Sequence, residues 1–144
     1  MKNFAALLIT LAFAASTVLG DIVIGYPHDG DGFKRGESLK LRVETDSHWD
    51  VKNANLKIRI EERTEDCDDD WSGCYGNGKH GTVLYDGAFK PYYTPGRPEL
   101  NYHDTFEIRI PKGFPKGSAV ISVALNDDEN YGQIDTEEVN IEVK

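Results

Sequence analysis

Carboxylates are the commonest side chains in this sequence that could do chemistry. The 144 residues contain 25 Asp and Glu against 16 Lys and Arg, which gives a net charge of −9. Asp29 and Asp31 stand in one Gly-rich segment, and a denser acidic run occupies residues 65–70. Calcium binds several such oxygens at once, so a calcium site at 65–70 is one interpretation. We favour the other, a solvated acidic loop whose charge Lys112 and Lys116 help to offset.

No residue pattern typical of catalysis accompanies these carboxylates. The sequence has no Gly-x-Ser-x-Gly nucleophile motif and no glycine-rich phosphate-binding loop. Its histidines are never four residues apart or in a His-x-His unit, as zinc or copper sites often require; they are His28, His48, His80 and His103. We therefore predict that the protein is not an enzyme and has neither a metal site nor a cofactor.

Aromatic side chains in the Gly- and Pro-containing segments suggest binding. The candidates are Trp49, Tyr92, Tyr93 and Tyr131. Tyrosine and tryptophan offer a large rigid contact area at low entropic cost, which is why binding loops use them. In the alternative interpretation, Trp49 and one tyrosine close the open end of the hydrophobic core.

We predict that β-strands position these residues, because apolar and polar residues alternate along the chain with a period of two. Leu39, Leu41 and Val43, for example, alternate with charged residues. The chain from 118 to 125 is more continuously apolar, which indicates a central strand. We predict an all-β protein, an immunoglobulin-like antiparallel β-sandwich of about seven strands. The predicted strands are 21–25, 37–44, 55–62, 81–86, 102–110, 118–125 and 136–143.

Antiparallel succession of these strands predicts where the loops lie. The loops before residues 55, 102 and 136 should share one end of the sandwich, and they carry the four candidate aromatic residues. The loops before residues 37, 81 and 118 should share the other end, which carries the acidic run. The two ends would therefore differ in chemistry.

Residues 1–20 resemble a secretory signal. Lys2 precedes an apolar run over Phe4–Ala15, and small residues precede Asp21. We predict a signal peptide at 1–20, a single domain at 21–144 and an extracellular, secreted product; a retained membrane anchor is the alternative. The acidic charge argues against nucleic acid or anionic membrane as a partner.

Cys67 and Cys74 are the two cysteines of the chain. In an oxidising compartment a close pair is most simply a disulfide bond. The short loop that it closes predicts a stabilisation of about 2–3 kcal/mol. Two free thiols are the alternative.

Several segments resemble a known family. They are Phe33-Lys34-Arg35-Gly36-Glu37, Gly81-Thr82-Val83-Leu84, the run from Phe106 through Pro111-Lys112-Gly113-Phe114-Pro115-Lys116-Gly117, and the terminal Val139–Val143. Together they resemble fungal secreted effectors of the necrosis-inducing secreted protein 1 type. The resemblance implies a small immunoglobulin-like effector that binds host proteins and has no catalytic residues. The acidic Cys67–Cys74 segment departs from the family's pattern.

From these observations we predict a secreted, non-catalytic binding protein. The main hypothesis is an effector-like protein that binds an extracellular or host protein through Trp49, Tyr92, Tyr93 and Tyr131. The first alternative is a carbohydrate-binding or cell-wall module that uses the same aromatic residues. The second alternative is a calcium-dependent adhesive domain.

Overall fold

The computed structural model describes residues 22–45, 54–63, 81–127 and 132–144, and all their regular elements are strands. These are β1 (Ile22–Tyr26), β2 (Asp31–Phe33), β3 (Ser38–Thr45), β4 (Ala54–Glu62), β5 (Thr82–Ala88), β6 (Tyr102–Arg109), β7 (Gly117–Asp127) and β8 (Gly132–Val143). Within these ranges no helix is long and apolar enough to cross a membrane. The predicted all-β class is confirmed.

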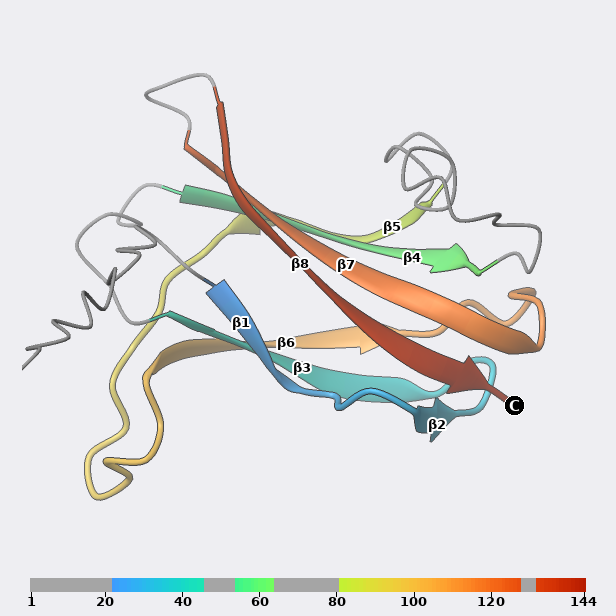
Figure 1. Ribbon diagram of the computed structural model, residues 1–144, viewed down its shortest axis with the longest axis horizontal. Helices are drawn as coiled ribbons and strands as arrows, with labels where there is room; N and C mark the ends of the chain where they lie inside the picture. The colour runs from blue at the N-terminus through green and yellow to red at the C-terminus, as the bar shows by residue number, and fades with distance from the viewer. Residues whose placement is uncertain (1–21, 46–53, 64–80, 128–131) are drawn as a thin grey trace, which may run out of the picture.

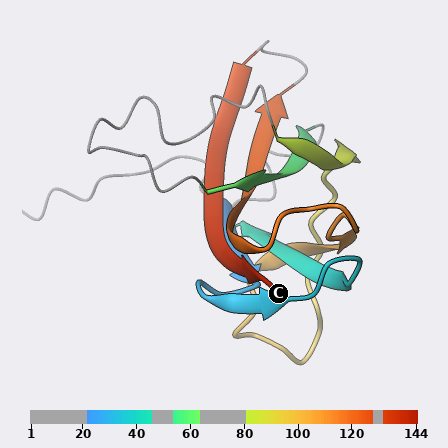
Figure 2. The same ribbon diagram turned by 90° about the vertical axis from the view of Figure 1, so that its right-hand side faces the viewer.

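Two sheets pack face to face (Figures 1 and 2). One has the order β1-β3-β6 and the other β2-β8-β7-β4-β5. Alternate residues of both sheets point into one shared core, as the sequence pattern predicts. The immunoglobulin-like sandwich is therefore confirmed. Its buried apolar residues are Ile22, Phe33, Leu39, Leu41, Val43, Ala54, Leu56, Ile58, Ile60, Phe89, Phe106, Ile108, Ile110, Phe114, Ala119, Ile121, Val123, Leu125, Val139, Ile141 and Val143.

β7 is the central strand of the larger sheet, as its sequence predicts. It pairs antiparallel with β4 on one side and with β8 on the other. Its inward residues, such as Ile121 and Val123, are fully buried. Its outward residues, such as Ser122 and Ala124, are small. The long side chains on the outer face of this sheet therefore come mainly from β4 and β8.

The strand prediction is incomplete at two places. It misses β2, which pairs parallel with β8 from Asp31↔Ile141 to Phe33↔Val143. A three-residue strand containing Gly32 is too short to show alternation. The prediction also starts the last strand too late, since β8 begins at Gly132. A register shift opposite Leu125 and Asn126 interrupts the alternation there. The other boundaries differ by at most two residues.

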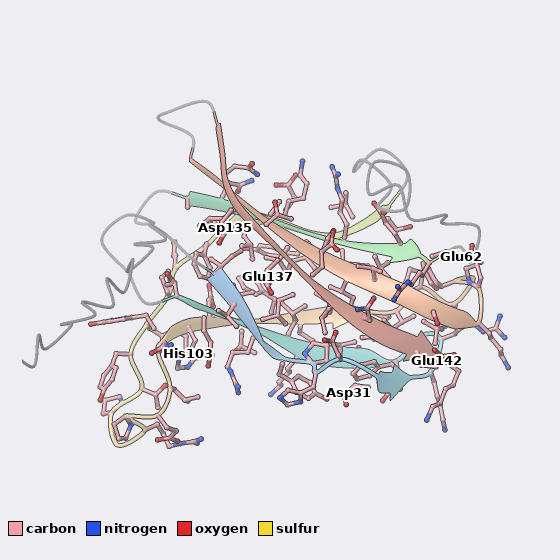
Figure 3. All side chains as sticks on the ribbon, in the orientation of Figure 1. Asp31, Glu62, His103, Asp135, Glu137 and Glu142 are labelled. Atoms are coloured by element: carbon pink, nitrogen blue, oxygen red, sulfur yellow. The ribbon has the colours of Figure 1, made fainter. Side chains whose placement is uncertain are left out.

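Asp135 joins the two sheets at the start of β8. Its Oδ2 accepts a hydrogen bond of 2.8 Å from the backbone N–H of Ile22 in β1. Asp135 and Glu137 continue the inward positions of Val139 and Ile141 along β8. In Figure 3 both acidic side chains lie along the half of β8 next to β1. The inward row of β8 thus changes from apolar to acidic where it meets the edge of the smaller sheet.

Glu138, on the outer face of the larger sheet, has two other carboxylates near it. Burial raises the pKa of Glu138, and the nearby carboxylates of Glu61 and Glu137 raise it further. A group whose pKa is higher in the folded protein than in the unfolded chain destabilises the fold as the pH rises through the folded value. The charged form of Glu138 should therefore destabilise the protein at neutral pH.

We expect Glu138→Gln to raise the melting temperature at pH 7, because the substitution removes this charge. The gain should vanish below about pH 3, where the carboxyl is protonated in both states. Thermal unfolding at both pH values measures it. Glu107→Gln is the control, because Glu107 is exposed opposite Lys40. A gain that is equal at both pH values would contradict the electrostatic explanation.

The described loops lie at the predicted ends. Residues 110–116 meet residues 34–37 through two backbone hydrogen bonds, from Gly36 N–H to Ile110 O (2.8 Å) and from Ile110 N–H to Glu37 O (2.9 Å). The connection 89–101 lies at the opposite end of the sandwich (Figure 1). For these loops the predicted separation is confirmed.

Candidate functional site

Two of the predicted binding residues lie in the connection between β5 and β6. We call residues 89–101 the tyrosine loop. It begins at Phe89, which is buried in the core and donates its backbone N–H to Ala54 O at 3.1 Å. It ends at Asn101, just before β6. The loop therefore crosses from the larger sheet to the smaller one.

Backbone hydrogen bonds hold the tyrosine loop along its length. Tyr92 and His103 form an antiparallel bridge, with N–H to O distances of 2.9 and 3.0 Å. Further along, Arg97 N–H donates to Thr94 O (3.2 Å) and Leu100 N–H donates to Arg97 O (3.0 Å). Gly96 supports this turn with a φ of +80°, which glycine adopts without strain. These hydrogen bonds therefore fix the path of the loop backbone.

Tyr92 and Tyr93 each expose about half of their surface, 49% in both cases. The ring of Tyr92 packs on the ring of His103 with 4.6 Å between centroids, and Tyr93 packs on Tyr102 at 6.0 Å. Consecutive residues of an extended segment point to opposite sides. The two rings therefore have different partners, and each is supported on one side and open to solvent on another.

His103 supports Tyr92 and is itself 4% exposed. Its Nδ1 lies 2.8 Å from Asn101 O, and its Nε2 lies 3.1 Å from Thr94 Oγ1. A carbonyl oxygen only accepts, so Nδ1 carries a hydrogen and donates it. In the neutral ring, Nε2 then accepts from the Thr94 hydroxyl. Figure 3 shows His103 where the tyrosine loop meets β6.

No sequence pattern assigns His103 a role. Alternation along β6 places it on the outer face of the smaller sheet, opposite Glu44. That position predicts an exposed side chain. The tyrosine loop pairs with β6 at this point, and the side chains of Tyr92 and Thr94 contact the buried ring. Only this tertiary pairing of Tyr92 with His103 reveals it. His103 is a positioning residue for Tyr92.

We expect Thr94→Val to lower the free energy of unfolding by about 1 kcal/mol, because it removes the hydrogen bond to His103 Nε2. Urea denaturation measures the change. Thr105→Val is the matched control, since Thr105 is exposed on β6. Equal changes in the two variants would show that the Thr94 hydroxyl does not stabilise the His103 ring.

The other predicted site residues lie outside the described residues. These are Trp49, Tyr131, the Cys67 and Cys74 pair and the acidic run 65–70. The described strand ends that lead to Trp49 and Tyr131 do lie close together: Ala54 of β4 pairs with Asp127 of β7, and Thr45 of β3 pairs with Tyr102. The chain therefore leaves toward both residues from the end that carries the tyrosine loop.

Asp29 and Asp31 accept hydrogen bonds at the turn that leads into β2. Asp31 Oδ2 accepts the N–H of His28 at 2.9 Å, and Asp29 Oδ1 accepts the N–H of Asn140 in β8 at 2.9 Å. Gly30 completes the turn with a φ of +87°. Across the described ranges, no three His, Cys, Asp or Glu side chains form a group that could bind a metal ion. Asp31 therefore closes the turn, and Asp29 joins it to the C-terminal strand.

No family model matches the chain. No curated protein sequence matches it either. The predicted effector family therefore stays a prediction of the sequence.

Several solved structures are similar to this chain, and three of them are described here. A chitin binding domain from Burkholderia pseudomallei has a TM-score of 0.50 and 11% identity over 81% of this chain. The chain spans only 57% of that domain's length. Fibronectin(III)-like modules of Clostridium thermocellum CbhA score 0.42 at 16% identity, covering 86% of this chain and 96% of theirs. The PmoD soluble domain from Methylocystis scores 0.40 at 14%, covering 79% and 78%. At these identities the similarity concerns the fold alone.

Proposed function

We propose that this protein is a non-catalytic module that binds an uncharged polysaccharide, with chitin as the first candidate, through the tyrosine loop. One observation carries the proposal. Tyr92 and Tyr93 are half exposed, yet each ring rests on a second ring and the backbone between them is fixed by hydrogen bonds.

Such rings suit a sugar ligand for a physical reason. The C–H faces of a pyranose ring are apolar and pack on aromatic surfaces, while its hydroxyls need polar partners. A tyrosine supplies an apolar face and a hydroxyl in one side chain. Since the rings are supported before binding, little conformational entropy is lost when a sugar chain settles on them. The loop also carries exposed polar side chains, such as that of Asn101, which suit hydrogen bonds to sugar hydroxyls.

The negative net charge of the chain disfavours some classes of polymer as ligands. A net charge of −9 repels anionic polysaccharides and nucleic acids but not uncharged glycans. The similar fold of a chitin binding domain supports chitin as the first polymer to test. The tyrosine loop itself offers no feature that favours a host protein over a polysaccharide, so the carbohydrate-binding hypothesis replaces the effector hypothesis as our main one.

A pull-down on insoluble polymers tests the proposal. Purified protein is mixed with chitin, cellulose and β-glucan, and the bound fraction is measured. We expect retention on chitin that soluble chitin oligomers compete away. Protein that stays in the supernatant with all three polymers would contradict the proposal. Equal retention on all three polymers, with no competition by any oligomer, would also contradict the proposal.

A further inference from the structure

A row of four side chains crosses the outer face of the smaller sheet and ends at Tyr92. Val23 of β1 lies opposite Glu44 of β3, and Glu44 lies opposite His103 of β6. His103 in turn bridges to Tyr92. Figure 1 shows β1, β3 and β6 side by side in this order. We call Val23, Glu44, His103 and Tyr92 the outer row.

The side chains of the outer row all point away from the core. Val43 and Thr45, on either side of Glu44, are buried, so Glu44 points outward. The same alternation turns Val23 outward, and this residue is 50% exposed. The ring of Tyr92 packs on the ring of His103. The row is therefore apolar and exposed at both ends, with Val23 at one and Tyr92 at the other.

The middle of the outer row is a fixed polar pair, Arg42 and Glu44. Arg42 Nε donates to Glu44 Oε1 at 3.1 Å, and Arg42 Nη2 donates to the backbone oxygen of Gly25 in β1 at 3.1 Å. The side chain of Glu44 is only 15% exposed. Gly25 makes this arrangement possible, because a Cβ at this position would lie 2.8 Å from both side chains. The pair therefore lies close to the backbone of β1 and does not separate the two exposed ends of the row.

The chemistry of the outer row matches that of an uncharged sugar chain. The two charges at its centre offset each other, so this part of the surface neither attracts nor repels a charged ligand strongly. A guanidinium has five N–H donors and a carboxylate has two oxygens, so the contacts within the described residues leave donors and an acceptor for sugar hydroxyls. The apolar faces of the sugar rings would pack on Tyr92 and Val23.

We propose that a polysaccharide chain bound at Tyr92 runs across the smaller sheet along the outer row to Val23. This inference rests on the proposed function and adds Val23, Arg42 and Glu44 to its binding surface. Three steps between neighbouring strands span about 14 Å, a length that a disaccharide does not cover. The site should therefore prefer longer oligomers to a disaccharide.

NMR titration of the isotope-labelled protein with chitobiose and with chitotetraose tests the inference. We expect chitotetraose to shift the amides of Tyr92 and Glu44 and the methyl groups of Val23. Chitobiose should leave the Val23 methyl groups unchanged. Chitotetraose should bind at least about tenfold more tightly than chitobiose, because it adds apolar contacts and hydrogen bonds. The methyl groups of Val83, on the other sheet, should shift with neither sugar.

Val23→Ala and Val83→Ala form a matched pair of variants, because Val83 is 47% exposed, nearly as much as Val23. Val23→Ala should bind chitotetraose about three- to fivefold more weakly than the wild type does and should bind chitobiose equally well. Val83→Ala should bind both sugars like the wild type. Equal effects of the two substitutions on chitotetraose binding would overturn the inference.

Two outcomes separate the outer row from the tyrosine loop. Chitotetraose shifts at Tyr92 that spare Val23 and Glu44 would overturn the inference and leave the proposed function standing. The absence of shifts with either sugar would contradict both the inference and the proposed function.

Discussion

Replacing Tyr92 and Tyr93 together by alanine should weaken binding to chitin by at least about 30-fold, the loss expected when a central aromatic contact is removed. Both side chains are half exposed, so their loss should change the free energy of unfolding little. Binding isotherms on insoluble chitin measure the first effect, and urea denaturation measures the second. The combination of lost binding and retained stability is the expected result.

Two control variants make this result specific. Tyr92→Phe/Tyr93→Phe keeps the rings and should lose much less affinity than the alanine variant. Val83→Ala removes an exposed apolar side chain from β5, outside the tyrosine loop, and should bind like the wild type. If the alanine variant bound chitin as tightly as Val83→Ala did, the tyrosine loop would not be the binding surface.

Phe106→Ala should have the largest effect on stability, a loss of about 3–5 kcal/mol in the free energy of unfolding. Phe106 of β6 is 6% exposed. Its ring lies 4.6 Å from the ring of Tyr85 in β5 and 6.4 Å from that of Phe89. Phe106 therefore packs the smaller sheet against β5 and against Phe89, the first residue of the tyrosine loop. Alanine would leave a cavity between the two sheets.

Urea denaturation of Phe106→Ala checks this value. Glu107→Ala is the control, because the next residue points outward and is exposed; its change should stay within about 0.5 kcal/mol. Because Phe89 begins the tyrosine loop, Phe106→Ala should also weaken chitin binding. A loss below about 1 kcal/mol in Phe106→Ala would contradict the packing described for this cluster.

The sequence predicts the fold well because the alternation of apolar and polar residues is a local pattern. It arises because one face of each strand is buried in the core. Leu39, Leu41 and Val43 show it plainly, and the continuous apolar run of β7 predicts its central place. The signal fails where a strand depends on distant partners. β2 has three residues and exists through its pairing with β8, which lies more than a hundred residues along the chain. No local pattern could show that pairing.

The candidate site is predicted only in part. Tyr92 and Tyr93 stand out by residue type and by the prolines around them. Their support by His103 and Tyr102 depends on how the loop returns over β6, which is a tertiary property.

The most direct test of the central claim is an amide NMR titration with a soluble chitin oligomer. If the tyrosine loop binds the sugar, the largest shifts should fall on Tyr92, Tyr93, Thr94 and His103. The amides of Glu62, Gly113 and Phe114, at the opposite end of the sandwich, should stay unchanged. No shifts at millimolar oligomer, or shifts confined to that opposite end, would contradict the claim that these tyrosines form the polysaccharide-binding surface.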